Sequence, residues 1–153
     1  ANCEQDPYPA TVAHKKLGPY HAMLVASPEA DSRLLDFVTP HQRKPVSLIC
    51  NEPEGYYQMD MDRYLEARDI RLEPYMKLQS IEAVKRCVMS NLGLAVVPTY
   101  SVEEELKNGS LIPVKTELDE KLYHSVYVYH KNKWLSPQME LALKLLKQTV
   151  GVK

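Results

Sequence analysis

The sequence is poor in glycine and has no long apolar run, and each shortage excludes a class of protein. Five glycines in 153 residues do not form a phosphate-cradling loop or a dinucleotide-binding fingerprint. The serine of a nucleophile elbow is also missing. No apolar run approaches the roughly 20 residues of a membrane span, so we expect no membrane contact. The chain opens with Ala1 rather than Met and without a signal-peptide pattern, so we expect a fragment or a mature form.

Cysteine and histidine are too few and too scattered to form a metal site or a disulfide framework. Cys3, Cys50 and Cys87 are an odd number at wide spacing, which favours a reducing compartment. Cys50 and Cys87 lie in apolar runs and are expected to be small buried hydrophobic residues, with a redox-sensing pair as the alternative. We therefore predict no metal, no cofactor and no catalytic residue.

Charge is balanced, with 19 basic and 20 acidic residues and a formal net charge of −1. Duplex DNA requires a concentrated basic face that neutralises phosphates, so this segment alone is not expected to bind DNA. Hydrophobic residues make up 44% and charged residues 25%, which is typical of a globular domain rather than a disordered chain.

The stretch from Gln79 to Pro98 predicts a helix, a tight turn and a buried strand. Ser80 is an N-cap, and the apolar residues that follow fall on one face at helical spacing. Asn91 and Gly93 are residue types that tolerate the left-handed conformation in which helices end. The wholly apolar run 94–97 then suits a strand buried on both faces of a parallel sheet. The helical face consists of Ile81, Val84, Cys87 and Val88.

Other segments predict an alternation of strands and helices, which builds parallel sheets. Pro74 has no amide hydrogen to donate, so its strand is expected at a sheet edge. Ser101 and Glu104 form a capping-box pattern, and Asn108-Gly109 ends the helix that follows. The expected elements are a loop over 1–19, strands at 20–26, 46–50, 72–78, 111–114 and 122–129, and helices at 31–38, 56–68 and from Ser136-Pro137 onward, the last with a stripe of Met139, Ala142, Leu143, Leu146 and Val150.

Two neighbouring stretches carry a family resemblance. They read Ser-Ile-Glu-Ala-Val-Lys-Arg-Cys-Val-Met-Ser-Asn-Leu-Gly-Leu-Ala-Val-Val-Pro and Val-Glu-Glu-Glu-Leu-Lys-Asn-Gly-Ser-Leu. This sequence resembles the effector-binding domain of LysR-type bacterial transcription regulators. One departure is Asn91, where that family usually has Gly.

The resemblance implies an α/β fold of the type 2 periplasmic-binding-protein-like class, with two doubly wound lobes joined by two crossing strands. Residues 28–129 would form a complete second lobe. Residues 1–27 and 130–153 would be a remnant of the first lobe, whose opening elements and preceding DNA-binding helix-turn-helix are absent.

The resemblance also indicates where a ligand binds. Ser80 would contact the effector, since relatives have Ser or Thr at this point and the first amides of a helix lack internal partners. By itself Ser80 would be nothing more than a helix cap, and the resemblance makes the effector contact an equal interpretation. Other candidate contacts are Gln79, Cys50, Asn51, Glu52 and Asn2. A ring of Tyr56-Tyr57 is a further candidate, although packing at the helix start is the better interpretation.

The implied function is sensing of a small, anionic metabolite in the cleft between the lobes. The protein would act in the cytoplasm as a homo-oligomer, a dimer or tetramer, and would contact DNA only through the missing N-terminal domain. The alternative is a solute-binding receptor of a transport system with the same fold. An enzyme on this fold lacks any visible nucleophile or acid–base pair.

Overall fold

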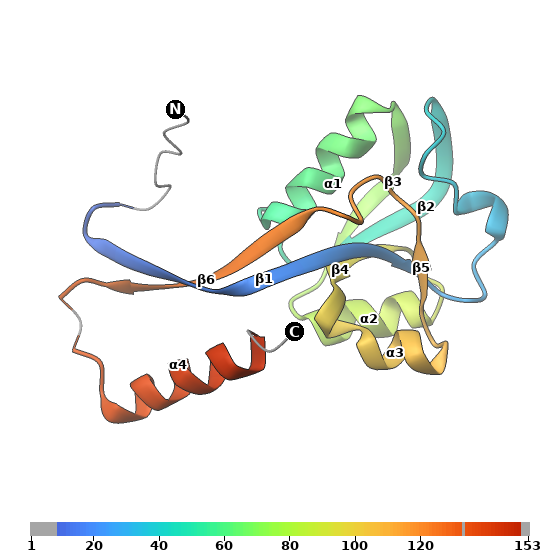
Figure 1. Cartoon of the computed structure of the whole chain (residues 1–153). Coiled ribbons are helices and arrows are strands. Elements are labelled where there is room, and N and C mark those ends of the chain that lie inside the picture. The colour runs from blue at the N-terminus through green and yellow to red at the C-terminus, as the bar shows by residue number, and fades with distance from the viewer. Residues whose placement is uncertain (1–8, 133, 151–153) are drawn as a thin grey trace. The chain divides into compact units, whose positions relative to one another are not determined.

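The computed structural model describes residues 9–132 and 134–150, and the chain divides into two compact units. One unit contains residues 21–123, and the other joins the residues up to 20 with those from 124 onward. In chain order the elements are β1 (Val12–Ala26), a 3₁₀ helix (Ser32–Leu34), β2 (Gln42–Cys50), α1 (Tyr56–Ala67), β3 (Ile70–Lys77), α2 (Ile81–Met89), β4 (Ala95–Pro98), a 3₁₀ helix (Thr99–Ser101), α3 (Glu103–Asn108), β5 (Ile112–Val114), β6 (Leu122–His130) and α4 (Pro137–Val150) (Figure 1).

The larger unit contains parallel strands, as the alternation of strands and helices predicts. β2 and β3 are parallel neighbours, with Cys50 opposite Lys77 at their carboxyl ends. On the other side of β2, Leu48 forms a parallel bridge with Leu94, directly before β4. Among the described strands β3 pairs with β2 alone, which confirms the edge position predicted from Pro74.

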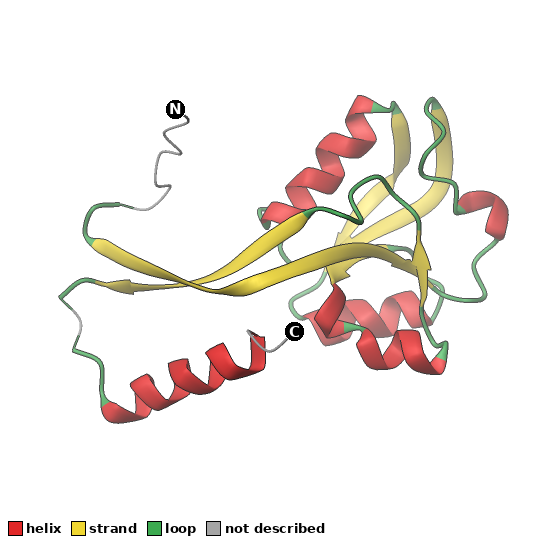
Figure 2. Ribbon diagram, in the orientation of Figure 1, coloured by secondary structure: helices red, strands yellow, loops and turns green. Residues whose placement is uncertain are grey.

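β1 adds an antiparallel part that the sequence did not predict. It pairs antiparallel with β4 on one side and with β5 on the other, and β6 also pairs with β1 (Figure 2). The run 94–97 is buried throughout, as predicted, but its surroundings are mixed rather than wholly parallel. A short strand with both faces covered is apolar in either arrangement, so composition alone does not separate the two.

Helices cover both sides of the parallel strands, with α1 on one side and α2 and α3 on the other (Figure 1). The predicted stripe of α1 is confirmed, since Met61, Tyr64 and Leu65 are all buried. On α2, Val84 and Val88 are buried, and Ile81 and Cys87 pack against the same core. That core consists of Val25, Ile49, Val84, Val88, Ala95, Val97, Val102 and Leu111.

Three local predictions were wrong. The loop expected over 1–19 gives way at Val12 to β1, because pairing with β6 supplies partners that the local sequence does not reveal. The helix expected over 31–38 is only one 3₁₀ turn, Ser32–Leu34. Ser101 does not begin α3: its hydroxyl donates to the Pro98 carbonyl at 2.6 Å, and Val102 is the N-cap without a side-chain bond.

Asn91 and Gly93 have different roles after α2. Asn91 has a φ of 58°, which confirms the predicted left-handed turn. Gly93 is needed for space instead: a Cβ there would lie 2.5 Å from the backbone oxygen of Ser47 and 3.1 Å from the Ile49 side chain. The close approach lets Leu94 donate to Ser47 at 2.9 Å and accept from Ile49 at 2.7 Å, which joins this segment to β2.

In the smaller unit, α4 begins as predicted, because the Ser136 hydroxyl accepts from the amide of Met139 at 3.3 Å. Met139, Ala142 and Leu143 of its predicted stripe line a hollow together with residues 128–130 of β6. Leu146 of the same stripe is half exposed, and the side chain of Val150 lies outside what the structure describes.

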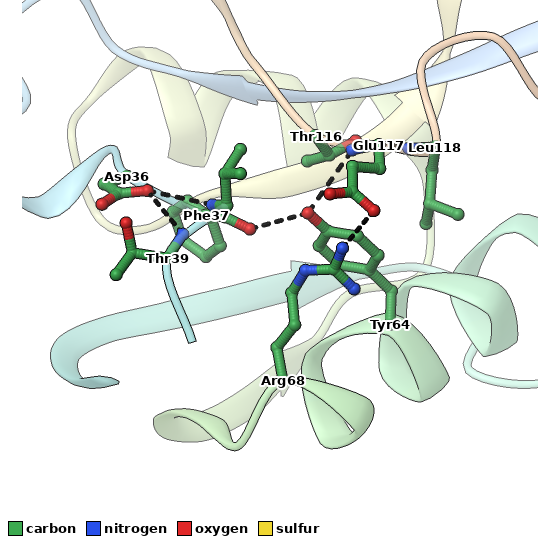
Figure 3. Close-up of polar contacts among 9 residues, drawn as sticks. Asp36, Phe37, Thr39, Tyr64, Arg68, Thr116, Glu117 and Leu118 are labelled. Carbon is green, nitrogen blue, oxygen red and sulfur yellow. Dashed lines mark hydrogen bonds and ion pairs between the residues drawn. The ribbon is translucent and has the colours of Figure 1, made fainter. Parts of the chain in front are cut away.

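Tyr64 joins three segments of the larger unit (Figure 3). Its hydroxyl donates to the Phe37 carbonyl at 2.8 Å and accepts from the Glu117 amide at 3.4 Å. Arg68, one turn later on α1, stacks over the Tyr64 ring at 4.1 Å and forms an ion pair with Glu117. The segment before β2 and the segment after β5 are thus both attached to α1.

We expect Gly93→Asn to lower the free energy of unfolding by about 3 kcal/mol, because the new Cβ meets a backbone oxygen that has no room to move. Gly109→Asn is the matched control. Gly109 is left-handed with open space around it, so the same change should lower that free energy by less than about 1 kcal/mol. Urea denaturation measures the free energy of unfolding of both variants. Equal losses at the two positions would contradict the packing role of Gly93.

Tyr64→Phe should lower the free energy of unfolding by about 1 kcal/mol, since it removes a buried hydroxyl and leaves the Phe37 carbonyl without its partner. Tyr56→Phe changes a ring that is 63% exposed and should alter stability by less than about 0.5 kcal/mol. Thermal or urea unfolding compares the two variants. A Tyr64→Phe protein as stable as the parent would show that this hydroxyl does not hold the segments together.

Candidate functional site

The carboxyl ends of the parallel strands meet at one edge of the larger unit. Cys50 and Lys77 are paired there, and the Leu78 amide donates to the Cys50 carbonyl at 2.8 Å. The loops that follow β2 and β3 therefore begin side by side. Open parallel sheets bind ligands at this edge, beyond the carboxyl ends of their strands.

A hollow of about 570 Å³ opens at this edge, within the larger unit. Its volume lies in the range of about 300–1,000 Å³ that is usual for small-molecule sites. The hollow is formed by the loop between β2 and α1, the first residue of α1 and the last residue of β3. The lining residues are Asn51, Glu52, Pro53, Glu54, Gly55, Tyr56 and Lys77.

The amino terminus of α1 opens into this hollow without a side-chain cap. Gly55 is the N-cap, and having no side chain it leaves the first amides of the helix without that partner. A Cβ at Gly55 would lie 3.2 Å from the Glu52 carbonyl oxygen, so a larger residue would crowd the loop. Amides without a side-chain cap and the helix dipole make this end of α1 a place that favours negative charge.

The charged side chains at this edge influence two other groups. Burial raises the pKa of the Tyr100 hydroxyl, and the negative charge of Glu52 raises that pKa further. Burial also raises the pKa of the Cys50 thiol, an effect that Asp62 increases and Lys77 opposes. Tyr100 follows β4, so the loops after β2 and β4 also lie close enough for their charges to interact.

The predicted site residues do not all come together. Asn51 and Glu52 line the hollow, and Cys50 is buried directly before them at the end of β2. Gln79 and Ser80 follow Lys77 by a few residues and are exposed, but neither lines the hollow. Asn2 lies outside the described residues.

Ser80 caps α2 as predicted. Its hydroxyl accepts from the Ala83 amide at 3.1 Å, so one lone pair of the oxygen is already occupied. The hydroxyl hydrogen remains able to donate to another group. The contrast with α1 is clear: α2 begins with a side-chain cap, whereas α1 begins at a glycine beside the hollow.

Sequence reasoning missed Lys77 and Gly55 as site residues. The signal for Lys77 was its position as the last residue of a strand next to β2, and the signal for Gly55 was a glycine directly before a helix. The Tyr pair was interpreted correctly in part. Tyr57 packs edge-on against Tyr123 with ring centres 6.3 Å apart, whereas Tyr56 lines the hollow and is largely exposed.

Among residues 9–132 and 134–150, no group of three or more His, Cys, Asp or Glu side chains is arranged to hold a metal ion. The helices in that part of the chain are all too short or too polar to cross a membrane.

Comparison with known families decides the classification. The model of the LysR substrate binding domain matches residues 3–151. The chain belongs to this family. Its fold is accordingly the type 2 periplasmic-binding-protein-like fold, which confirms the fold class predicted from the sequence.

Curated relatives of this LysR substrate-binding domain are transcriptional regulators. It is 30% identical over 135 residues to the uncharacterized HTH-type transcriptional regulator YfiE of Escherichia coli, an alignment that covers 88% of this chain and 45% of YfiE. It is 34% identical over 91 residues to the RuBisCO operon transcriptional regulator of Allochromatium vinosum, covering 60% of this chain and 30% of that protein. The chain thus spans less than half the length of these relatives.

Solved regulatory domains share the fold. The HypT regulatory domain of Salmonella typhimurium in its apo form has a TM-score of 0.65 at 18% identity, covering 95% of this chain and 68% of that domain. The Synechocystis CcmR regulatory domain in complex with 2-PG has a TM-score of 0.65 at 13% identity, covering 95% of this chain and 70% of that domain.

We expect Ser80→Ala to lower the free energy of unfolding by about 1 kcal/mol, because the Ala83 amide loses its side-chain acceptor. Ser80→Thr keeps a hydroxyl and should recover most of that loss. Ser90→Ala, at the exposed opposite end of α2, is the control and should change stability by less than about 0.5 kcal/mol. Urea denaturation of the three variants measures these differences. A Ser80→Ala protein as stable as the parent would rule out the capping role.

Proposed function

We propose that this domain senses a small metabolite with an anionic group and belongs to a cytoplasmic, homo-oligomeric transcription regulator. The observation that carries the proposal is the match to the LysR substrate binding domain across residues 3–151. The relatives support it, since YfiE is an HTH-type transcriptional regulator and the Allochromatium vinosum protein is a transcriptional regulator. A transport receptor of the same fold is the alternative, and none of these relatives is described as one.

The hollow in the larger unit is the proposed ligand site. The Lys77 ammonium and the Asn51 amide supply the side of the hollow on which an anionic group binds. Gln79, Ser80, Cys50 and Asn2 remain proposed contacts in addition. The role assigned to these groups is binding and orientation, and we assign no catalytic step to the domain.

We assign residues 28–129 to a complete second lobe and residues 1–27 with 130–153 to part of the first. The division of the chain into two compact units supports a two-lobed organisation, although that division falls after residues 20 and 123. A ligand shifts an equilibrium between two states only as far as it binds one of them better. Such a shift, passed to a helix-turn-helix domain in the full-length protein, is the proposed control of transcription.

The test is a gel-shift experiment with DNA from upstream of the gene. The full-length regulator should bind a specific site with a dissociation constant of about 10⁻⁸ M or tighter. Residues 1–153 alone should not bind it, because with a net charge of −1 they have no excess of positive charge to neutralise phosphates. Sequence-dependent nanomolar binding by residues 1–153, or no DNA binding by the full-length protein, would contradict the proposal.

A further inference from the structure

The hollow at the ends of β2 and β3 is lined by charges of both signs. Glu52 and Glu54 contribute carboxylates, and Lys77 contributes an ammonium group. None of the ion pairs formed among the described residues includes any of the three. Three charges therefore surround one hollow without neutralising one another, which leaves each of them able to pair with a bound molecule.

The position of Glu52 is fixed by the turn that it begins. Its carbonyl accepts from the Gly55 amide at 3.0 Å, and its carboxylate oxygen Oε2 would lie 3.8 Å from a Cβ at Gly55. The charge of the same carboxylate raises the pKa of the Tyr100 hydroxyl, so Glu52 lies near the turn that follows β4. The negative side of the hollow thus has a defined location.

The positive charge of the hollow lies on the neighbouring strand β3, and Asn51 after β2 adds a neutral hydrogen-bond donor. Lys77 ends β3, opposite Cys50, and the Asn51 amide group follows Cys50 along the chain. A ligand with only negative groups would face both carboxylates, and that repulsion would oppose its binding. A ligand that carries an ammonium group beside its carboxylate would meet a partner for each charge.

We propose that the ligand of this hollow is a zwitterion of the amino-acid class, with its ammonium group held by Glu52 and Glu54 and its carboxylate by Lys77 and Asn51. This proposal rests on the sensing function proposed above and specifies its ligand. The exposed Tyr56 ring and Pro53 are the apolar surfaces of the hollow and would contact the ligand's side chain. The volume of about 570 Å³ is large enough for a molecule of the size of an amino acid.

The test is isothermal titration calorimetry on the full-length regulator with the common amino acids. Each amino acid that binds is compared with the acid that lacks its amino group, such as aspartate with succinate, glutamate with glutarate and alanine with propionate. We expect at least one amino acid to bind, and its partner acid to bind at least about tenfold more weakly.

Substitutions of the charged residues that line the hollow separate the contribution of its carboxylates from that of its ammonium group. The double variant Glu52→Gln/Glu54→Gln should weaken amino-acid binding at least about tenfold, while Lys77→Gln should weaken the amino acid and its partner acid alike. Glu104→Gln/Glu120→Gln removes two exposed carboxylates of the same unit outside the hollow and should leave affinity unchanged. Thermal unfolding of each variant confirms that the affinities refer to folded protein.

Three results would overturn the inference: no amino acid binds, the partner acids bind as tightly as the amino acids, or Glu52→Gln/Glu54→Gln leaves amino-acid affinity unchanged. If acids without an amino group bind and change DNA binding in the gel-shift experiment, sensing stands and only the zwitterion assignment fails. If the full-length protein binds no specific DNA, the proposed function itself fails.

Discussion

The larger unit depends on the approach of the backbone at Gly93–Leu94 to β2. The two hydrogen bonds between Leu94 and β2, at 2.9 and 2.7 Å, place β4 beside β2 with the same direction. They form only because position 93 has no side chain to strike the Ser47 carbonyl. Without this contact β2 would keep β3 as its partner but lose its link to β4 and, through β4, to β1.

The order of the strands then determines where polar loops gather. Because β2, β3 and the segment leading into β4 run in one direction, their carboxyl ends share one edge, and the loops that follow them lie together. The helices between the strands return the chain beneath or above the sheet, and their apolar stripes form the core. Charged residues at this edge are therefore brought together by topology rather than by closeness in sequence, as Lys77 and Glu52 illustrate.

The sequence predicted the segments whose pattern is strong over a full helix or strand. The stripes of α1 and α2, the start of α4 and the strand β6 all follow from local periodicity and capping chemistry, which act within a few residues. Predictions failed where distant pairing decided the structure. β1 extends to Val12 because of β6, and α3 begins at Glu103, with Val102 as its N-cap, because Ser101 is used in the turn before it.

Predictions for the candidate site also succeeded where local sequence decided the structure and failed where distant pairing did. Asn51 and Glu52 were predicted because they directly follow a recognisable buried strand, and both line the hollow. Ser80 was favoured because serine at a helix start is visible in the sequence, yet an uncapped glycine at the start of α1 is a stronger indication of an open amide end. Lys77 was missed although it lies near the end of a predicted strand, since the pairing that places it beside Cys50, 27 residues earlier, is not visible in the sequence.

The raised pKa of the Cys50 thiol has a chemical consequence for this edge of the sheet. Oxidants and electrophiles react with the thiolate, and a buried thiol that holds its proton is a poor nucleophile. The sulfur therefore acts as a small apolar group at the end of β2. Cys50 is thus a poor target for oxidants and electrophiles, and the charge and shape of this edge come from the loop residues that line the hollow.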